Sequence, residues 1–223
     1  MTLTSSQAKK FYDRFGKKQD AQAFYEDAAL NDLIAHAHFE SASSVFELGC
    51  GTGRFAARLL EQHLSPSALY EGVDVSTTMI DIARDRLAPF APRAKVSLSD
   101  GAMTIPLADH SIDRFVSTYV LDLLSEQQIH QVIKEACRVL TKDGKLCLVS
   151  LTGGNTVISR TISGLWSMVF QLSASLVGGC RPVRLESFVD QTLWSIEHQH
   201  VASQFGIPSE VLVACPKISQ KSQ

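Results

Sequence analysis

The spacing of apolar and polar residues divides the chain into helical runs and short β-rich runs. Two helical patterns come first, at about 6–14 and 21–38. Further along, short apolar runs alternate with runs whose apolar residues recur every three or four positions. This pattern predicts strands at 45–48, 69–73, 95–98, 115–120 and 146–151, and helices at 53–62, 76–87 and 126–140. Strands alternating with helices of this length indicate βαβ units and a mostly parallel sheet.

The pattern changes in the last third of the chain. No charged residue occurs at 161–180, but the large apolar residues there recur with the period of an amphipathic helix, and we expect a soluble helix rather than a membrane span. A short helix is expected at 185–191. Two β-like runs follow at 194–201 and 210–214, joined by a short loop, so the sheet is expected to end in an antiparallel hairpin.

Composition narrows the class of protein. A chain of 223 residues is long enough to bury a core without disulfide or metal staples, and we expect one domain. Lys and Arg number 21 against 23 Asp and Glu, for a net charge of −2, which argues against a dedicated nucleic-acid binder. The five cysteines are isolated, so neither a disulfide framework nor a zinc ribbon fits them. Residues 1–18 contain no apolar signal segment, and we expect a cytoplasmic protein.

The most informative segment is the turn after the first predicted strand. Three glycines alternate there, Gly49, Gly51 and Gly53, and a helix begins at once. Glycine permits positive φ and lets the backbone approach a ligand closely, while the first turn of a helix offers free N–H groups. Such a turn at the carboxyl edge of a central strand is where open α/β sheets bind ligands.

Two acidic residues and one arginine indicate which ligand this glycine turn binds. A dinucleotide fingerprint needs a third glycine at position 54, which is Arg54, so a nicotinamide-dependent dehydrogenase is disfavoured. Glu47 would repel a pyrophosphate but would favour an ammonium or sulfonium group, and S-adenosylmethionine carries both. Asp74 closes the second strand, where a carboxylate can accept hydrogen bonds from both ribose hydroxyls. An ordinary loop remains the alternative for a glycine-rich turn taken alone.

At these residues the sequence resembles the class I S-adenosylmethionine-dependent methyltransferases, and a Rossmann-like fold is the expectation. Residues 47–53 look like the first motif of that family, 73–79 like its second, and 99–102 like the segment that holds adenine. The resemblance implies a cofactor site formed by Tyr12, Glu47, Gly49, Cys50, Gly51, Gly53, Asp74, Val75, Met79, Asp100, Gly101, Ala102 and Ser117.

The resemblance also implies a layout. Residues 11–15 are similar to the N-terminal lid of the subgroup that methylates quinone precursors, phospholipids and other small molecules. The expected fold is α/β and doubly wound, with a mostly parallel seven-stranded sheet, an antiparallel final strand and a helical cap. Its expected parts are an N-terminal helical lid (1–42), a cofactor-binding core (43–151), a helical cap (152–192), a closing hairpin (193–216) and a tail (217–223).

Catalytic residues do not stand out, because the cofactor supplies the electrophile and the protein mainly aligns the reactants. Tyr119 and Asp122 follow the fourth strand and are candidates to orient or deprotonate an acceptor. The alternative is that Asp122 caps a helix and Tyr119 packs. His200, near the end of the sixth strand, is a further candidate to face the acceptor.

Two histidine pairs raise the question of a metal site. His36 and His38 would diverge on a helix, while His198 and His200 would share a face of a strand without a visible third ligand. We therefore expect no metal.

The expected acceptor is a small, apolar or amphiphilic molecule. Trp166, Met168 and Phe170 of the uncharged helix would line its pocket, pack in the core, or make at most a peripheral contact with a membrane. Nucleic-acid methylation is disfavoured, because neither an Asn-Pro-Pro-Tyr-like segment nor a basic stripe is present. A non-catalytic S-adenosylmethionine-binding regulator or partner subunit is the alternative function. The oligomeric state is left open.

Overall fold

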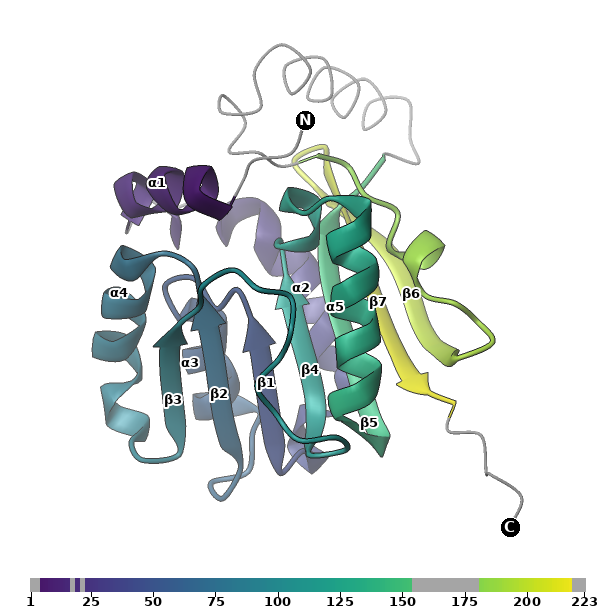
Figure 1. Cartoon of the computed structure of the whole chain (residues 1–223), viewed down its shortest axis with the longest axis horizontal. Coiled ribbons are helices and arrows are strands. Elements are labelled where there is room, and N and C mark those ends of the chain that lie inside the picture. Colours follow the sequence, from purple (N-terminus) through teal and green to yellow (C-terminus); the bar gives the residue numbers. More distant parts are fainter. Residues whose placement is uncertain (1–4, 17–18, 21–22, 154–180, 218–223) are drawn as a thin grey trace.

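The computed structural model describes residues 5–16, 19–20, 23–153 and 181–217. The helix expected at 161–180, with most of the expected cap, lies outside the described residues. A seven-stranded sheet forms the centre of the molecule, in the order β3-β2-β1-β4-β5-β7-β6 (Figure 1). The strands are β1 (Ser44–Leu48), β2 (Leu69–Asp74), β3 (Ala94–Leu98), β4 (Ile112–Thr118), β5 (Leu140–Leu151), β6 (Trp194–Gln204) and β7 (Ile207–Pro216).

The strand directions confirm the expected topology. β1 to β5 pair in parallel, whereas β7 runs antiparallel to both β5 and β6. The chain therefore has a doubly wound, Rossmann-like sheet with a reversed final strand. The carboxyl ends of β1, β2 and β4 meet at one edge, next to the point where the strand order reverses.

Helices cover both faces of this sheet (Figure 1). They are α1 (Ser5–Phe15), α2 (Ala23–Ala37), α3 (Arg54–Gln62), α4 (Thr77–Leu87) and α5 (Glu126–Val139), with short 3-10 helices η2 (Phe39–Ser41), η3 (Ala88–Phe90), η4 (Leu121–Leu123) and η6 (Leu185–Phe188). α2 and α3 pack on the face that carries Val45 and Val116, and α5 packs on the face that carries Phe46 and Phe115. These central-strand residues are buried on both faces, which explains their continuous apolar runs.

Several boundaries differ from the sequence expectation. β4 ends at Thr118 rather than residue 120, because Tyr119 has a φ of 56° and leaves the strand conformation. β5 begins at Leu140, directly after α5. The closing hairpin turns at Phe205 and Gly206, whose φ values of 52° and 80° are those of a two-residue type I′ turn, so both of its strands are longer than expected.

Within the described residues no helix combines the length and apolar character needed to cross a bilayer. The four cysteines described, Cys50, Cys137, Cys147 and Cys215, are free thiols. The core is thus held by packing and hydrogen bonds in the part of the chain that the structure describes.

Candidate functional site

A cleft opens at the carboxyl ends of β1, β2 and β4. Its walls come from the glycine turn after β1, from Asp74 and Val75 after β2, and from the 99–103 and 118–124 segments. Tyr12 of α1 and Gln19 close it from the N-terminal side. A smaller recess continues beneath the glycine turn and reaches Glu26 and Glu47.

The glycine turn depends on residues without a side chain. The N–H groups of Gly49 and Cys50 both donate to the carbonyl of Val73, at 2.8 and 3.0 Å, which bends the chain away from the sheet. Gly49 has a φ of 79°, and a Cβ there would lie 2.2 Å from Cγ2 of Val120. Backbone conformation and lack of space therefore both require glycine at this position.

Asp74 links the glycine turn to the end of β2. Its Oδ2 accepts a hydrogen bond from the Gly51 N–H at 3.0 Å, and its Oδ1 accepts one from the Ser76 N–H at 2.8 Å. Burial raises the pKa of Asp74 above its ordinary value, while these N–H donors oppose the rise. The carboxylate is thus held in one orientation at the cleft wall.

Among the acids that line the cleft and the recess, Glu47 is the most buried, with 1% of its surface exposed. The hydroxyl of Tyr70 donates to Glu47 Oε2 at 2.6 Å. Burial raises the pKa of Glu47 from 4.5 to about 7, and the negative charge of Asp74 adds to the rise, while the Tyr70 hydrogen bond opposes it. A cation bound beside Glu47 would offset its desolvation and restore the ionised form.

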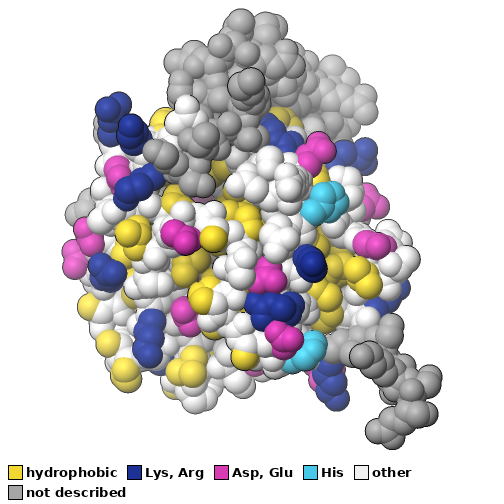
Figure 2. Space-filling view, in the orientation of Figure 1, with side chains coloured by type: hydrophobic (Ala, Val, Ile, Leu, Met, Phe, Trp, Pro, Cys, Tyr) yellow, Lys and Arg dark blue, Asp and Glu magenta, His cyan; other side chains and the backbone are white. Residues whose placement is uncertain are grey.

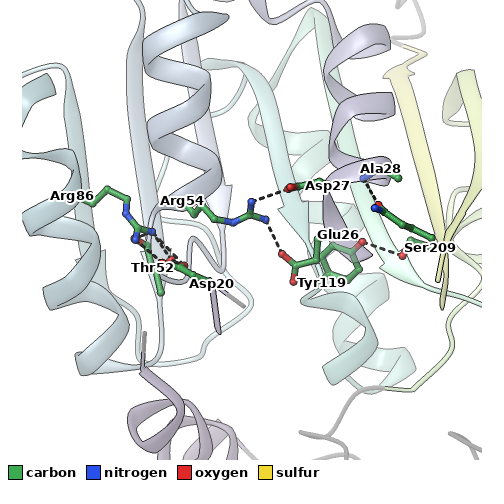
Figure 3. Close-up of polar contacts among 10 residues, drawn as sticks. Asp20, Glu26, Asp27, Ala28, Thr52, Arg54, Arg86, Tyr119 and Ser209 are labelled. Carbon is green, nitrogen blue, oxygen red and sulfur yellow. Dashed lines mark hydrogen bonds and ion pairs between the residues drawn. The ribbon is translucent and has the colours of Figure 1, made fainter. Parts of the chain in front are cut away.

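The N-terminal segment is held over the cleft by polar contacts. Ser76 Oγ donates to Asp13 of α1 at 2.6 Å, and Lys9 Nζ donates to Thr77 Oγ1 at 2.6 Å. Asp20 forms an ion pair with Arg86 at 2.6 Å and accepts from Thr52 Oγ1 at 2.6 Å (Figure 3). α1 and residues 19–20 are therefore anchored to α4 and the glycine turn.

A second polar group joins α2 to α3 (Figure 3). Arg54 contacts Asp27 at 2.7 Å and Glu26 at 3.0 Å. Glu26 is 9% exposed, and burial raises its pKa from 4.5 to about 7 despite the arginine. Tyr119 lies beside this group and donates to Ser209 Oγ at 3.0 Å. Burial raises the pKa of Tyr119, so its hydroxyl is a neutral donor and is ill suited to act as a base.

The residues expected to contact the cofactor fall into three groups. The cleft is lined by Tyr12, Gly49, Asp74, Val75, Gly101 and Ala102. The recess below is lined by Glu47, Gly49, Cys50 and Gly51. Four residues of the set are in neither lining. Gly53 packs on Ala83, and Met79 is buried. Ser117 donates to the Leu48 carbonyl, and Asp100 is exposed and accepts from the Ala102 N–H.

The three catalytic candidates are not brought together. Tyr119 lines both the cleft and the recess. Asp122 is fully buried in η4 and is not a lining residue. The His200 side chain is exposed on β6, with Nδ1 3.4 Å from Asp32 Oδ2 of α2, which places it away from the cleft.

Sequence reasoning missed the acid at position 26 and the apolar wall. Glu26 shares a helical face with buried Ala29 and Leu30. An acidic residue on the apolar face of a predicted helix was the sequence feature that could have identified it as a candidate site residue. The apolar side chains Val120, Leu123 and Leu124 reach the cleft because η4 reverses the chain after β4. A tertiary contact, invisible in the sequence, places a third potential metal ligand, Asp32, beside His36 and His198.

Comparisons with known proteins agree with this geometry. Residues 45–144 match a family model described as a methyltransferase domain. An uncharacterised methyltransferase-like protein of Schizosaccharomyces pombe is 34% identical over 118 residues (53% of this chain, 42% of that protein). A tRNA N(3)-methylcytidine methyltransferase of Drosophila melanogaster is 28% identical (62% of this chain, 46% of that protein). A demethylmenaquinone methyltransferase of Chlamydia pneumoniae is 34% identical (65% of this chain, 61% of that protein). The aligned parts thus span less than two thirds of these relatives.

Solved structures share the fold at low sequence identity. The [4+2]-cyclase SpnF aligns with a TM-score of 0.72 and 17% identity, over 96% of this chain and 97% of its own. A geranyl diphosphate C-methyltransferase from Streptomyces coelicolor, in complex with S-adenosyl-L-homocysteine, aligns with a TM-score of 0.66 and 11% identity, over 85% and 79%. The fold is that of Rossmann-like methyltransferases. The match to the family model and the names of the relatives together support the interpretation that this chain is a methyltransferase.

Proposed function

We propose that this protein transfers a methyl group from S-adenosylmethionine to a small, apolar or amphiphilic acceptor. The observation that carries the proposal is Glu47, a buried carboxylate beneath a glycine turn and close enough to Asp74 for the two charges to interact. Isolated buried carboxylates are costly, and a cationic ligand in the adjoining recess removes the cost. A sulfonium cofactor with an ammonium group fits that requirement, and a pyrophosphate does not.

The remaining cofactor contacts follow from the same geometry. Asp74 keeps lone pairs directed along the cleft wall after accepting the Gly51 and Ser76 N–H groups, and these would accept the ribose hydroxyls. The backbone at Gly101 and Ala102 lies on the same cleft and would contact the adenine ring. The S-adenosyl-L-homocysteine in the geranyl diphosphate C-methyltransferase, which shares the fold, supports a cofactor of this class.

The acceptor would enter against the apolar wall. Val120, Leu123, Leu124 and Met103 are apolar residues that line the cleft, and the polar side chains of Thr118, Tyr119 and Gln128 line it as well. Apolar side chains with a few polar groups among them favour a ligand that has a hydrophobic body and a polar end. The demethylmenaquinone methyltransferase relative is consistent with such an acceptor.

The cofactor supplies an electrophilic methyl group, so the chain's part is to align and shield. Glu47 would hold the charged end of the cofactor, and Asp74 would fix its ribose. Tyr119, with its raised pKa, would orient an acceptor by turning toward it the single O–H that the protein otherwise donates to Ser209. α1 and residues 19–20, tied to α4 and the glycine turn, would exclude water from the cleft.

Two other functions are tested by the same experiment. The tRNA methyltransferase relative favours a nucleic-acid acceptor, whereas the face in Figure 2 shows Lys and Arg interspersed with Asp and Glu rather than a basic stripe. A non-catalytic S-adenosylmethionine-binding protein would keep the cofactor site without turnover.

The test is a product screen with methyl-labelled S-adenosylmethionine against three fractions: a lipid extract, a polar metabolite extract and total tRNA. We expect label in the lipid extract together with release of S-adenosylhomocysteine. Label found only in the tRNA fraction would show that the acceptor is a nucleic acid and not a small apolar molecule. Cofactor binding by calorimetry without turnover in any fraction would favour the regulator, and NAD binding as tight as that of S-adenosylmethionine would overturn the cofactor assignment.

A further inference from the structure

A cluster of metal-binding side chains lies between α2 and β6, away from the cleft. Asp32 and His36 come from α2, and His198 comes from β6. One potential ligand atom of each lies within 4.8 Å of the others. His198 Nε2 is 2.7 Å from Asp32 Oδ2, and His36 Nδ1 is 3.5 Å from Asp32 Oδ1.

Local structure explains why these groups converge. Residues four apart on a helix share a face, so Asp32 and His36 point to the same side of α2. The pairing of β6 with β7 shifts register between Ile196 and His198, and His198 and His200 lie on one face of β6. α2 packs against that face, and the rings of His36 and His198 stack with centroids 3.5 Å apart and an interplanar angle of 5°.

The donor set matches the preferences of a borderline divalent metal. Imidazole nitrogen and carboxylate oxygen are ligands of Zn²⁺ at about 2.0–2.2 Å, which places tetrahedral ligand atoms about 3.4 Å from one another. Two distances, His36 Nδ1 to Asp32 Oδ1 at 3.5 Å and His200 Nδ1 to Asp32 Oδ2 at 3.4 Å, already have this value. The contact of His198 with Asp32, at 2.7 Å, would have to lengthen by about 0.7 Å, and one of the two stacked imidazole rings would have to turn for both to point at one ion.

We propose that Asp32, His36 and His198 bind a Zn²⁺ ion, with His200 or a water molecule as the fourth ligand, and that the ion fastens α2 to β6. The His36 side chain is 43% exposed and that of His200 56%, so a hydrated ion can reach the cluster from solvent. His36 Nδ1 also lies 2.8 Å from the Asp32 carbonyl, so binding either exchanges this hydrogen bond for a coordinate bond or uses Nε2.

The consequence of binding would be structural. α2 carries Tyr25 and Glu26, which lie next to Tyr119 at the cleft, and the Ala28 N–H donates to Gln204 of β6 at 3.2 Å. Metal binding near the other end of α2 would add a second fixed point between the helix and the strand. A ligand at free concentration L that binds only the folded state raises the free energy of unfolding by RT ln(1 + L/Kd), so the melting temperature rises with the logarithm of the free zinc concentration above Kd.

The experiment titrates ZnCl₂ into the untagged full chain, freed of metal with chelator, and follows heat by calorimetry and melting by circular dichroism. We expect one equivalent with a dissociation constant of about 10 µM or tighter, and a rise in melting temperature. His36→Gln with His198→Gln should weaken binding at least about tenfold and abolish the rise. Co²⁺ should give the absorption bands of a four-coordinate site in the wild type only.

Matched controls keep the test decisive. His38→Asn replaces a histidine at the end of α2 whose contact is Glu40, and asparagine tolerates its φ of 52°. Cys215→Ser removes a half-buried thiol that offers a competing zinc ligand. Both should bind like the wild type. If the double variant does not fold, Asp32→Asn provides the same comparison.

Two outcomes would overturn the proposal. The first is no binding tighter than about 1 mM, which would leave the cluster as a hydrogen-bonded tie between α2 and β6. The second is equal binding by the wild type and the cluster variants, which would place the ion elsewhere. Because the readout is metal binding, neither outcome bears on methyl transfer.

Discussion

Glu47→Gln should change how the stability of the protein depends on pH. Gln has the shape of Glu and can still accept the hydrogen bond from the Tyr70 hydroxyl, but it cannot ionise. In the wild type the pKa of Glu47 rises from 4.5 in the unfolded chain to about 7 in the folded protein, because the carboxyl group is buried. The variant therefore removes one titration and leaves the packing in place.

The sign and size follow from proton linkage. Below pH 4.5 Glu47 is protonated in both states and has no effect. Between pH 4.5 and 7 the unfolded chain releases the proton while the folded protein retains it, so rising pH favours unfolding. With 1.36 kcal/mol for each pKa unit, the wild type loses about 3 kcal/mol of unfolding free energy through Glu47 by pH 8. Through this titration the variant should gain about 1 kcal/mol over the wild type at pH 5 and about 3 kcal/mol at pH 8.

The assay is reversible urea unfolding, followed by circular dichroism at pH 5, 6, 7 and 8. Glu26 also titrates near pH 7, but it is present in both proteins and cancels in their difference. Glu61→Gln, at an exposed position of α3, is the control and should follow the wild type at every pH. A difference between wild type and Glu47→Gln that stays constant from pH 5 to pH 8 would refute the reasoning. If the proposed function holds, Glu47→Gln should also weaken S-adenosylmethionine binding.

Three further substitutions test other parts of the site. Asp74→Ala should weaken cofactor binding at least about tenfold by calorimetry with the fold intact, because charge-assisted hydrogen bonds contribute about 1.5–3 kcal/mol each; an unchanged dissociation constant would contradict the ribose assignment. Gly49→Ala should destabilise the protein by about 2 kcal/mol or more in urea unfolding, through its φ of 79° and contact with Val120. Adding Val120→Ala should recover only part of that loss, since φ is unchanged, and full recovery would show that sterics alone act. Tyr119→Phe should lower kcat at least about tenfold with cofactor affinity unchanged, whereas Ser209→Ala, which removes the partner of that hydroxyl, should not; equal effects would assign the tyrosine to packing.

The sequence was sufficient for features that rest on local chemistry. Alternating glycines after an apolar strand have few conformations compatible with a following helix, so the turn at 49–53 and its place beside Asp74 could be predicted. The parallel order followed from alternating periodicities, and the final hairpin from a short connection. The boundaries were less accurate where a single residue decides, as at Tyr119, whose positive φ ends β4 early.

Features that depend on tertiary packing were not predictable from local pattern. His36 was compared with its neighbour His38, whereas the folded protein stacks it on His198, 162 positions away along the chain. His200 was a candidate to face the acceptor from the end of a strand, but β6 lies at the far edge of the sheet and directs that side chain to α2. The cleft's apolar wall depends on the path of η4. A 3-10 helix of three residues is too short to produce a periodic sequence pattern, so this path could not be predicted.

The insertion of β7 between β5 and β6 has a consequence for synthesis on the ribosome. β5 and β6 emerge before their common partner, and β6 has no place beside β5 until β7 arrives. During that interval the backbone N–H and C=O groups of β5 that later pair with β7 have no strand partner, including those at Leu146 and Leu148. The side chains of these two residues are fully buried once the sheet is complete. An exposed apolar edge is the kind of surface that pairs with other nascent chains or recruits a chaperone. Slow translation through residues 194–216 would prolong this exposure, whereas the tight turn at Phe205 and Gly206 shortens it by bringing β7 back along β6 as soon as it is made.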